Sequence, residues 1–220
     1  KGGTSPFIFT PKDFETPYGN LETDKELFEK FADILWYDPV EEEYLHRNEH
    51  SLEFQALWLK YIWRDRQIKW LGILVSDFER FAHDRPPSSI EYIEKFFIDS
   101  EKILAELKEK GKRIMVISGA DLSHVGPRFG DDIQITPSVK SEVENYDRSV
   151  IQNILELRSD EFYMSVVSKN NQTHICGLSA IYASLRFIKA LNPNAKGRLC
   201  DYAQADDPFG GFVSFASIVF

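Results

Sequence analysis

The strongest constraint on the fold is an apolar run at the end of the chain. Residues 211–220 read Gly-Phe-Val-Ser-Phe-Ala-Ser-Ile-Val-Phe, with large apolar side chains at both odd and even positions. Successive side chains of a β-strand point to opposite faces, so this run predicts a strand near 210–220 that is buried on both faces. Such a strand needs helices above and below its sheet. We therefore expect an α/β fold, arranged as a three-layer α/β/α sandwich.

The rest of the chain alternates between strand-like and helix-like periods, as such a fold requires. The apolar pattern predicts further strands at 69–75, 113–117 and 197–204. It predicts helices at about 51–64, 89–110, 142–157, 159–169 and 174–191. In the first of these helices Phe54, Leu57, Trp58 and Tyr61 recur at helical spacing, which is typical of a face turned toward a core. With 220 residues and no linker-like stretch, we expect one domain over residues 1–220.

Composition excludes several classes of function. The formal net charge is −9 and the basic residues are interspersed with acids, so we expect no nucleic-acid partner. Two cysteines give no disulfide framework. No apolar run approaches the ~18 residues that span a bilayer, and no apolar signal core begins the chain. We therefore expect a cytoplasmic protein without a membrane partner.

The first candidate site follows the predicted strand at 113–117. Asp121 and His124 lie just beyond the end of that strand, where open α/β sheets bind their ligands. An Asp three residues before a His can share a proton with it or bind the same metal ion. We favour this functional role over the alternative, in which Asp121 caps a helix and His124 is merely packed nearby.

A second candidate, His50, lies at the entrance of a predicted helix and is flanked by Glu49 and Glu53. A carboxylate beside a His suits a metal ligand whose second ring nitrogen needs an acceptor. Taken alone, this setting does not establish a ligand role. His46 lies four residues earlier, but that spacing makes a two-His metal face only on a continuous helix, and Asn48 reads as a cap.

A third candidate is Cys176. Thr173 predicts an N-cap, which places Cys176 in the first turn of the following helix. A helix N-terminus lowers the pKa of a thiol and so favours the thiolate that binds metals or attacks as a nucleophile. The alternative is a small buried hydrophobe, and the residues alone favour that alternative. Cys200, in the strand-like Arg-Leu-Cys-Asp-Tyr, is expected in the core.

Four segments, in this order, resemble motifs of the Memo family (AmmeMemoRadiSam system protein B). Asn-Glu-His-Ser-Leu-Glu-Phe at 48–54 is similar to the family's Asp-Glu-His-Ser-Ile-Glu-Met. Ser-Gly-Ala-Asp-Leu-Ser-His-Val-Gly-Pro-Arg-Phe at 118–129 is similar to its Ser-Ser-Asp-Phe-Cys-His-Trp-Gly-x-Arg-Phe. His-Ile-Cys-Gly at 174–177 resembles its Thr-Ile-Cys-Gly, and Asp-Tyr-Ala-Gln at 201–204 matches its Tyr-Ala-Gln. The resemblance covers most of the chain.

The resemblance implies a fold related to the class III extradiol dioxygenases (LigB-like), in which two His and a carboxylate hold non-haem iron. In Memo-like proteins the corresponding pocket is ascribed two His and a Cys, with iron or copper as the metal. Carried over by motif, His50 and Cys176 are implied metal ligands. Asp121 and His124 are implied to line the same pocket, with His124 as an acid/base group or replacement ligand and Asp121 as the residue that orients it.

Two family segments, Pro-His-Ala-Gly-Tyr with the first ligand His and Gly-Pro-Ser-His-His, have no counterpart in this sequence. We therefore expect a chain that is N-terminally truncated relative to the family and a metal site that is degenerate.

Two functions from different classes follow. The first is a metal-dependent oxidoreductase with dioxygenase-like chemistry on a small-molecule or peptide ligand, using iron or copper. The second is a non-catalytic protein that binds a peptide or protein partner through the vestigial pocket. Either is compatible with a homo-oligomer. We favour a Memo-like metal-site protein, degenerate in this chain.

Overall fold

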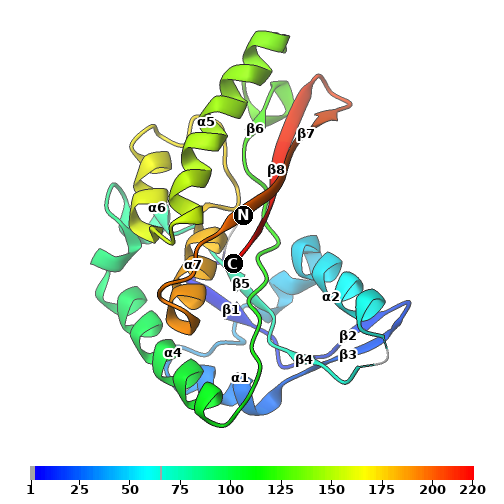
Figure 1. Ribbon diagram of the computed structural model, residues 1–220, viewed down its shortest axis with the longest axis vertical. Coiled ribbons are helices and arrows are strands. Elements are labelled where there is room, and N and C mark those ends of the chain that lie inside the picture. The colour runs from blue at the N-terminus through cyan, green and yellow to red at the C-terminus, as the bar shows by residue number, and fades with distance from the viewer. Residues whose placement is uncertain (1–2, 65) are drawn as a thin grey trace.

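The computed structural model describes residues 3–64 and 66–220 and has a mixed α/β fold, as the sequence predicts (Figure 1). Its helices are α1 (Lys25–Ala32), α2 (His50–Ile62), α3 (Glu79–Ala82), α4 (Glu91–Glu109), α5 (Pro137–Leu155), α6 (Ser159–Val167) and α7 (Leu178–Leu191), with short 3-10 helices η1 (Glu43–Asn48), η2 (Pro87–Ser89) and η3 (Pro127–Phe129). Its strands are β1 (Phe7–Phe9), β2 (Phe14–Thr16), β3 (Gly19–Thr23), β4 (Lys69–Trp70), β5 (Ile73–Val75), β6 (His124–Val125), β7 (Arg198–Asp207) and β8 (Gly211–Val219). No helix in these described ranges is long and apolar enough to cross a membrane.

The strands of the described residues form three small sheets. β1 pairs with β5, β3 lies between β2 and β4, and β8 lies between β6 and β7. The β7–β8 ribbon is antiparallel, and it runs beside helix α5, whereas α2 and the β2–β3–β4 sheet form a separate group (Figure 1). The described residues thus form no single sheet with helices on both faces.

The main core lies between α4, α7 and the β1–β5 pair. Helix α4 buries one face, which includes Ile93, Phe96, Phe97 and Leu104. The ring of Phe96 stacks on that of Phe7 from β1, with ring centroids 3.9 Å apart. This apolar packing fixes β1 and β5 against the helices, since burying a Phe side chain contributes about 1.5–3 kcal/mol.

The final strand differs from its prediction. β8 is buried at its start, where Phe212 is inaccessible to solvent, but Phe215 and Val219 are 42% and 46% exposed. The prediction that both faces of this strand are buried is therefore wrong. The reason is that only one face of β8 packs against the core along its length: Ala216 and Ile218 contact the main core, whereas Phe215 and Val219 on the opposite face reach solvent. Cys200, expected in the core, is likewise exposed, at an irregularity of β7.

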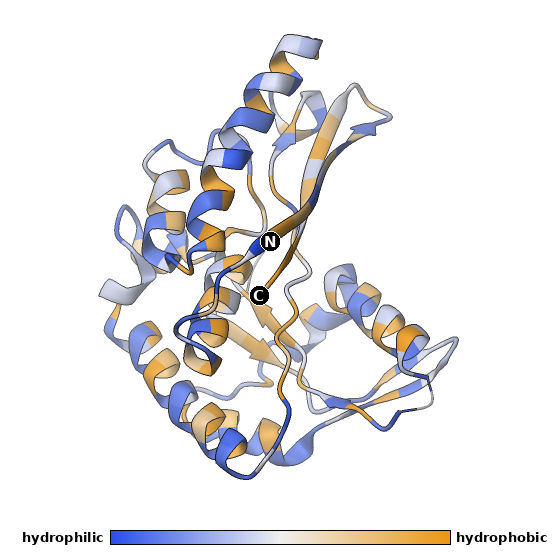
Figure 2. Cartoon of the chain, in the orientation of Figure 1, coloured by the Kyte–Doolittle hydropathy of each residue, from blue (hydrophilic) through white to orange (hydrophobic). Residues whose placement is uncertain are grey.

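The predicted strands at 69–75 and 113–117 also differ. The first is divided between two strands that belong to different sheets: β4 pairs with β3, and β5 pairs with β1. The second joins no ladder in the described part of the chain, although the connection between α4 and β6 is apolar for several residues (Figure 2). Met115 and Ile117 are 56% and 42% exposed. An apolar strand pattern alone does not form a strand, because the backbone also needs a neighbouring strand to bond with.

Helix α2 forms where predicted but turns the other face inward. Ala56 and Leu59 are buried against Leu21 of β3, while Phe54, Trp58 and Tyr61 are exposed. The face of α2 that contacts the β2–β3–β4 sheet is the one with Ala56 and Leu59, so the aromatic face lies on the solvent side. Helix α5 starts earlier than predicted, because Thr136 accepts a hydrogen bond from the N–H of Val139 and Pro137 fits the first helical position.

The pairing of β6 with β8 depends on a close backbone approach, which yields a stability prediction. A Cβ on Gly211 would lie 2.4 Å from the carbonyl oxygen of Val125. We predict that Gly211→Ala lowers the free energy of unfolding by about 2 kcal/mol or more, measured by urea denaturation. Gly111→Ala is the control: its φ is +74° but no atom lies within 4 Å of the new Cβ, so it should cost only about 1 kcal/mol. Equal losses in both variants would contradict the close approach.

Candidate metal centre

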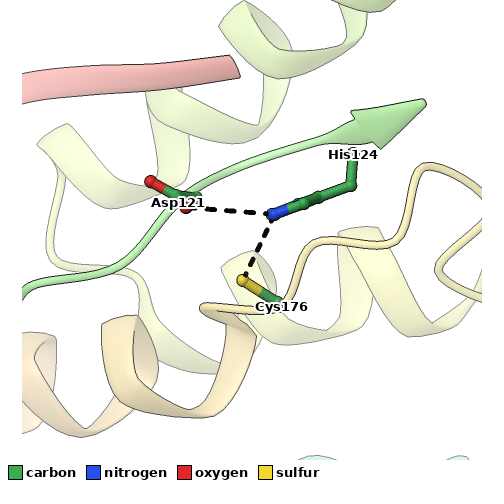
Figure 3. A group of neighbouring side chains, drawn as sticks. All are labelled: Asp121, His124 and Cys176. Atoms are coloured by element: carbon green, nitrogen blue, oxygen red, sulfur yellow. Dashed lines mark hydrogen bonds and ion pairs between the residues drawn. The ribbon is translucent and has the colours of Figure 1, made fainter. Parts of the chain in front are cut away.

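Three side chains with metal-binding chemistry meet in the fold (Figure 3). Asp121, His124 and Cys176 each offer one ligand atom, and these atoms all lie within 4.8 Å of one another. His124 Nε2 is 3.9 Å from Asp121 Oδ2 and 3.8 Å from Cys176 Sγ. The structure therefore brings together three of the four residues that the sequence singles out.

The chain from Asp121 to His124 is held by β8. The N–H of Leu122 donates to Ser214 O at 2.9 Å, and the N–H of Ser214 donates to Ser123 O at 2.8 Å. His124 then pairs with Val213 in the β6–β8 ladder. This backbone pairing fixes the direction in which the imidazole leaves the chain.

Two asparagines shape the backbone of the segment that leads to Cys176. Asn170 and Asn171 have φ values of +53° and +45°, a left-handed conformation that Asn tolerates better than most residues. The Asn171 side chain accepts a hydrogen bond from the N–H of Ile175 at 2.8 Å. The N–H of His124 donates to Thr173 O at 2.7 Å, which joins this segment to the chain carrying His124.

Gly177 lets the Cys176 segment approach Asp121 closely. A Cβ at Gly177 would lie 2.6 Å from the Cβ of Ala120 and 2.7 Å from the carbonyl oxygen of Asp121. Any larger residue would push the two segments apart. The sequence Cys-Gly therefore combines a thiol with the space that it needs beside the carboxylate.

The hydrogen bonding of His124 leaves one nitrogen for a ligand. Its Nδ1 lies 3.1 Å from Leu122 O, and a carbonyl oxygen only accepts, so Nδ1 carries the proton. In the neutral imidazole Nε2 then has a free lone pair, and Nε2 is the atom that faces Asp121 and Cys176 (Figure 3). A backbone carbonyl on the distal nitrogen is the usual arrangement around a metal-binding His.

The setting of Cys176 differs from its prediction. Helix α7 begins at Leu178, so Cys176 precedes the helix and Thr173 does not cap it. Burial of its sulfur raises the pKa of the Cys176 thiol, although the residue reaches solvent, and the charge of Asp121 raises that pKa further. The predicted lowering by a helix N-terminus is therefore wrong, and the neutral thiol is favoured without a cation.

The structure does not bring His50 to this cluster. Its side chain is 75% exposed, with Nδ1 3.6 Å from Glu49 Oε1 and the ring against Phe54. His46 is also elsewhere: its Nε2 lies 3.1 Å from Ile8 O, and burial lowers the pKa of His46. Neither imidazole is among the side chains that surround Cys176.

The sequence reasoning missed a buried carboxylate beside the cluster. Asp147 of α5 is inaccessible to solvent and accepts hydrogen bonds from the hydroxyls of Ser123, Ser214 and Tyr202. Burial raises the pKa of the Asp147 carboxyl, and these hydroxyls oppose that shift. A signal was present in the sequence, because Asp147 occupies the apolar face of α5 with Val143, Val150 and Ile151.

Comparisons with known proteins agree on one family. The family model for Memo-like proteins matches residues 2–219. The chain is 31% identical over 217 residues to a MEMO1 family protein of Aquifex aeolicus, covering 98% of this chain and 52% of that protein. It is 28% identical over 207 residues to a MEMO1 family protein of Archaeoglobus fulgidus, covering 93% of this chain and 66% of that one.

This mixed α/β chain belongs to the Memo-like protein family. A MEMO1 family protein of Methanocaldococcus jannaschii is a further relative, 31% identical over 216 residues that make up 94% of this chain and 63% of that protein. The chain thus spans between about half and two thirds of the length of these curated relatives.

The electrostatics of Cys176 give a second prediction. Replacing Asp121 by Asn removes a negative charge beside the thiol, so the pKa of Cys176 falls and more thiolate is present at a given pH. We predict that Asp121→Asn speeds alkylation of Cys176 by iodoacetamide at pH 8 by up to about tenfold, the effect of one pKa unit. Peptide mass spectrometry separates Cys176 from Cys200, whose rate is the internal control. A slower rate at Cys176 would contradict the assigned charge effect.

Proposed function

We propose that this chain is a mononuclear metal-site protein in which Asp121, His124 and Cys176 hold one iron or copper ion for redox chemistry of the dioxygenase-like kind. The observation that carries the proposal is that the three potential ligand atoms lie within 4.8 Å of one another. His50, which the motif resemblance implies as a ligand, is replaced in this proposal by Asp121 and His124.

The donor set fits such an ion. Tetrahedral coordination at ordinary metal–sulfur and metal–nitrogen distances separates neighbouring ligand atoms by about 3.5 Å. The separations of 3.8 and 3.9 Å around His124 Nε2 need only a small adjustment to reach that value. A thiolate, an imidazole and a carboxylate together suit late first-row metals. The lone pair of Nε2 already faces the other two groups.

The residues of the cluster would hold the ion from different sides. A bound redox metal would supply Lewis acidity and electron transfer to a substrate. Asp121, half exposed at the edge of the cluster, would hold the solvent side. His124, whose side chain is 15% exposed, would anchor the inner side. Three protein ligands leave coordination positions open, which is the pattern of catalytic rather than structural sites. The relation to the class III extradiol dioxygenase fold belongs to this proposal too.

The non-catalytic alternative is a competing proposal. It assigns the cluster no metal and uses the vestigial pocket to bind a peptide or protein. A metal titration separates the two, because only the metal-site proposal requires stoichiometric binding that depends on Asp121, His124 and Cys176.

We predict that the metal-free chain binds Co²⁺, a spectroscopic substitute for iron or copper, at one site per chain. A thiolate-to-cobalt charge-transfer band should appear in the near ultraviolet, since that band requires sulfur coordination. Cys176→Ser should abolish the band, and His124→Ala should weaken binding by at least about tenfold, because each removes a ligand. Absorption titration against a competing chelator measures both effects.

His50→Ala is the matched control for His124→Ala. We predict that it leaves cobalt affinity within about twofold of the unmodified chain, because its imidazole is exposed and does not belong to the group of three ligand atoms. A Cys200→Ser variant controls for the second thiol in the same way. If His50→Ala weakens binding as much as His124→Ala does, the ligand set proposed for the cluster is wrong.

A further inference from the structure

One buried carboxylate lies beside the segment that carries Asp121 and His124. Asp147 Oδ1 accepts a hydrogen bond from Ser123 Oγ at 2.6 Å, and Oδ2 accepts from Ser214 Oγ at 2.5 Å and from Tyr202 OH at 2.8 Å. Ser123 precedes His124 in the chain, and Ser214 and Tyr202 belong to β8 and β7. The three hydrogen bonds of Asp147 thus join it to β7, to β8 and to the residue that precedes β6.

The same network reaches the segment that carries Cys176. The hydroxyls of Ser123 and Thr173 share a hydrogen bond of 2.8 Å. Thr173 lies three residues before Cys176, and its carbonyl oxygen accepts the N–H of His124 at 2.7 Å. Asp147, Ser123 and Ser214 are inaccessible to solvent, and Thr173 is nearly so. Solvent cannot replace any hydrogen bond that this network loses.

The position of His124 and Cys176 relative to each other depends on this network. A buried hydroxyl without a partner costs about 1–3 kcal/mol, so Ser123 and Ser214 are held where Asp147 can accept from them. Any movement of Ser123 carries the backbone of His124 with it, and any movement of Thr173 carries the segment leading to Cys176. Asp147 itself touches none of the three candidate ligands, so its action is through these neighbours.

We propose that Asp147 is a positioning residue of the metal site, which sets the separation of His124 Nε2 and Cys176 Sγ by holding Ser123 and, through it, Thr173. This inference rests on the proposed function of the cluster. Groups that orient metal ligands from behind typically contribute 10- to 100-fold in metal affinity. A carboxylate suits the position because it only accepts, and three hydroxyls donate to it; an amide would face at least one of them with its own donors.

The test compares Asp147→Asn with Asp160→Asn. Asp160 is the matched control, because it also accepts hydrogen bonds from two hydroxyls, Ser88 Oγ and Tyr182 OH, but at the junction of α6 with α7 and η2. We expect Asp147→Asn to weaken Co²⁺ binding at least about tenfold and to shift the thiolate-to-cobalt band at saturating metal. Asp160→Asn should change neither, even where the two variants lose similar unfolding free energy in urea.

If Asp147→Asn does not fold, the less disruptive variant Ser123→Ala tests the same role. Ser123→Ala removes the hydroxyl that links Asp147 to Thr173 and leaves the carboxylate in place. It should weaken cobalt binding and shift the band in the same direction, while Ser165→Ala, which removes a hydroxyl bonded to Phe162 O, should not. Unchanged affinity and spectrum in both Asp147→Asn and Ser123→Ala would overturn the positioning role.

A metal-free measurement separates the failure of this inference from failure of the proposed function. If the unmodified chain binds no cobalt, the metal-site proposal fails, and the alkylation rate of Cys176 at pH 8 then decides the positioning role. Asp147→Asn should change that rate at least threefold, because the thiol moves relative to Asp121, and Asp160→Asn should leave it unchanged. An equal rate in all three proteins would remove the positioning role as well.

Discussion

The geometry of the candidate site depends on one set of backbone contacts, between residues 122–125, β8 and Thr173. Leu122, Ser214 and His124 each donate an N–H to a carbonyl of a neighbouring segment, at 2.9, 2.8 and 2.7 Å. These three bonds join parts of the chain that are 49 to 92 residues apart in sequence. Because they are backbone bonds, they fix where the Cα atoms of the site lie before any side chain is considered. The side chains of Ser123, Ser214 and Asp147 then complete the same junction.

The charges at this junction explain why a cation would suit it. Asp121 and a Cys176 thiolate would be two anions side by side, which raises the pKa of the thiol. The neutral imidazole of His124 presents a lone pair and not a proton to both, so it cannot relieve that repulsion. A bound cation would relieve it, and binding would release the thiol proton. The cluster thus places two groups that can be anionic and one imidazole lone pair around one space, an arrangement that a cation would complete.

Much of this structure follows from the sequence. The wrong predictions share one cause, which is that they depend on which segments lie side by side in the fold. The periods of α4, α6 and β7 predict elements close to those observed, and α4 and α6 each bury one face against neighbouring helices. The apolar run at 113–117 predicts a strand, but pairing depends on which other segment lies beside it, and no local pattern contains that information. The exposed aromatic face of α2 has the same origin, because the small sheet beneath it accepts only Ala56 and Leu59.

For the candidate site, too, the sequence predicts which segments come together but not which side chains point toward the cluster. The motif around His50 implies a ligand role for that residue, and its segment does approach the cluster: the charge of Glu49 raises the pKa of Cys176, and Gln55 lies against Gly119. It does not predict which side chain points inward. Successive residues of a helix differ by about 100° in direction, so a segment can approach a site while its histidine faces solvent. The sequence predicts Asp121 and His124 as neighbours because only two residues separate them, and in the structure their side chains lie 3.9 Å apart. The direction of His50 depends instead on how α2 rests on the β2–β3–β4 sheet, and that is a property of tertiary packing.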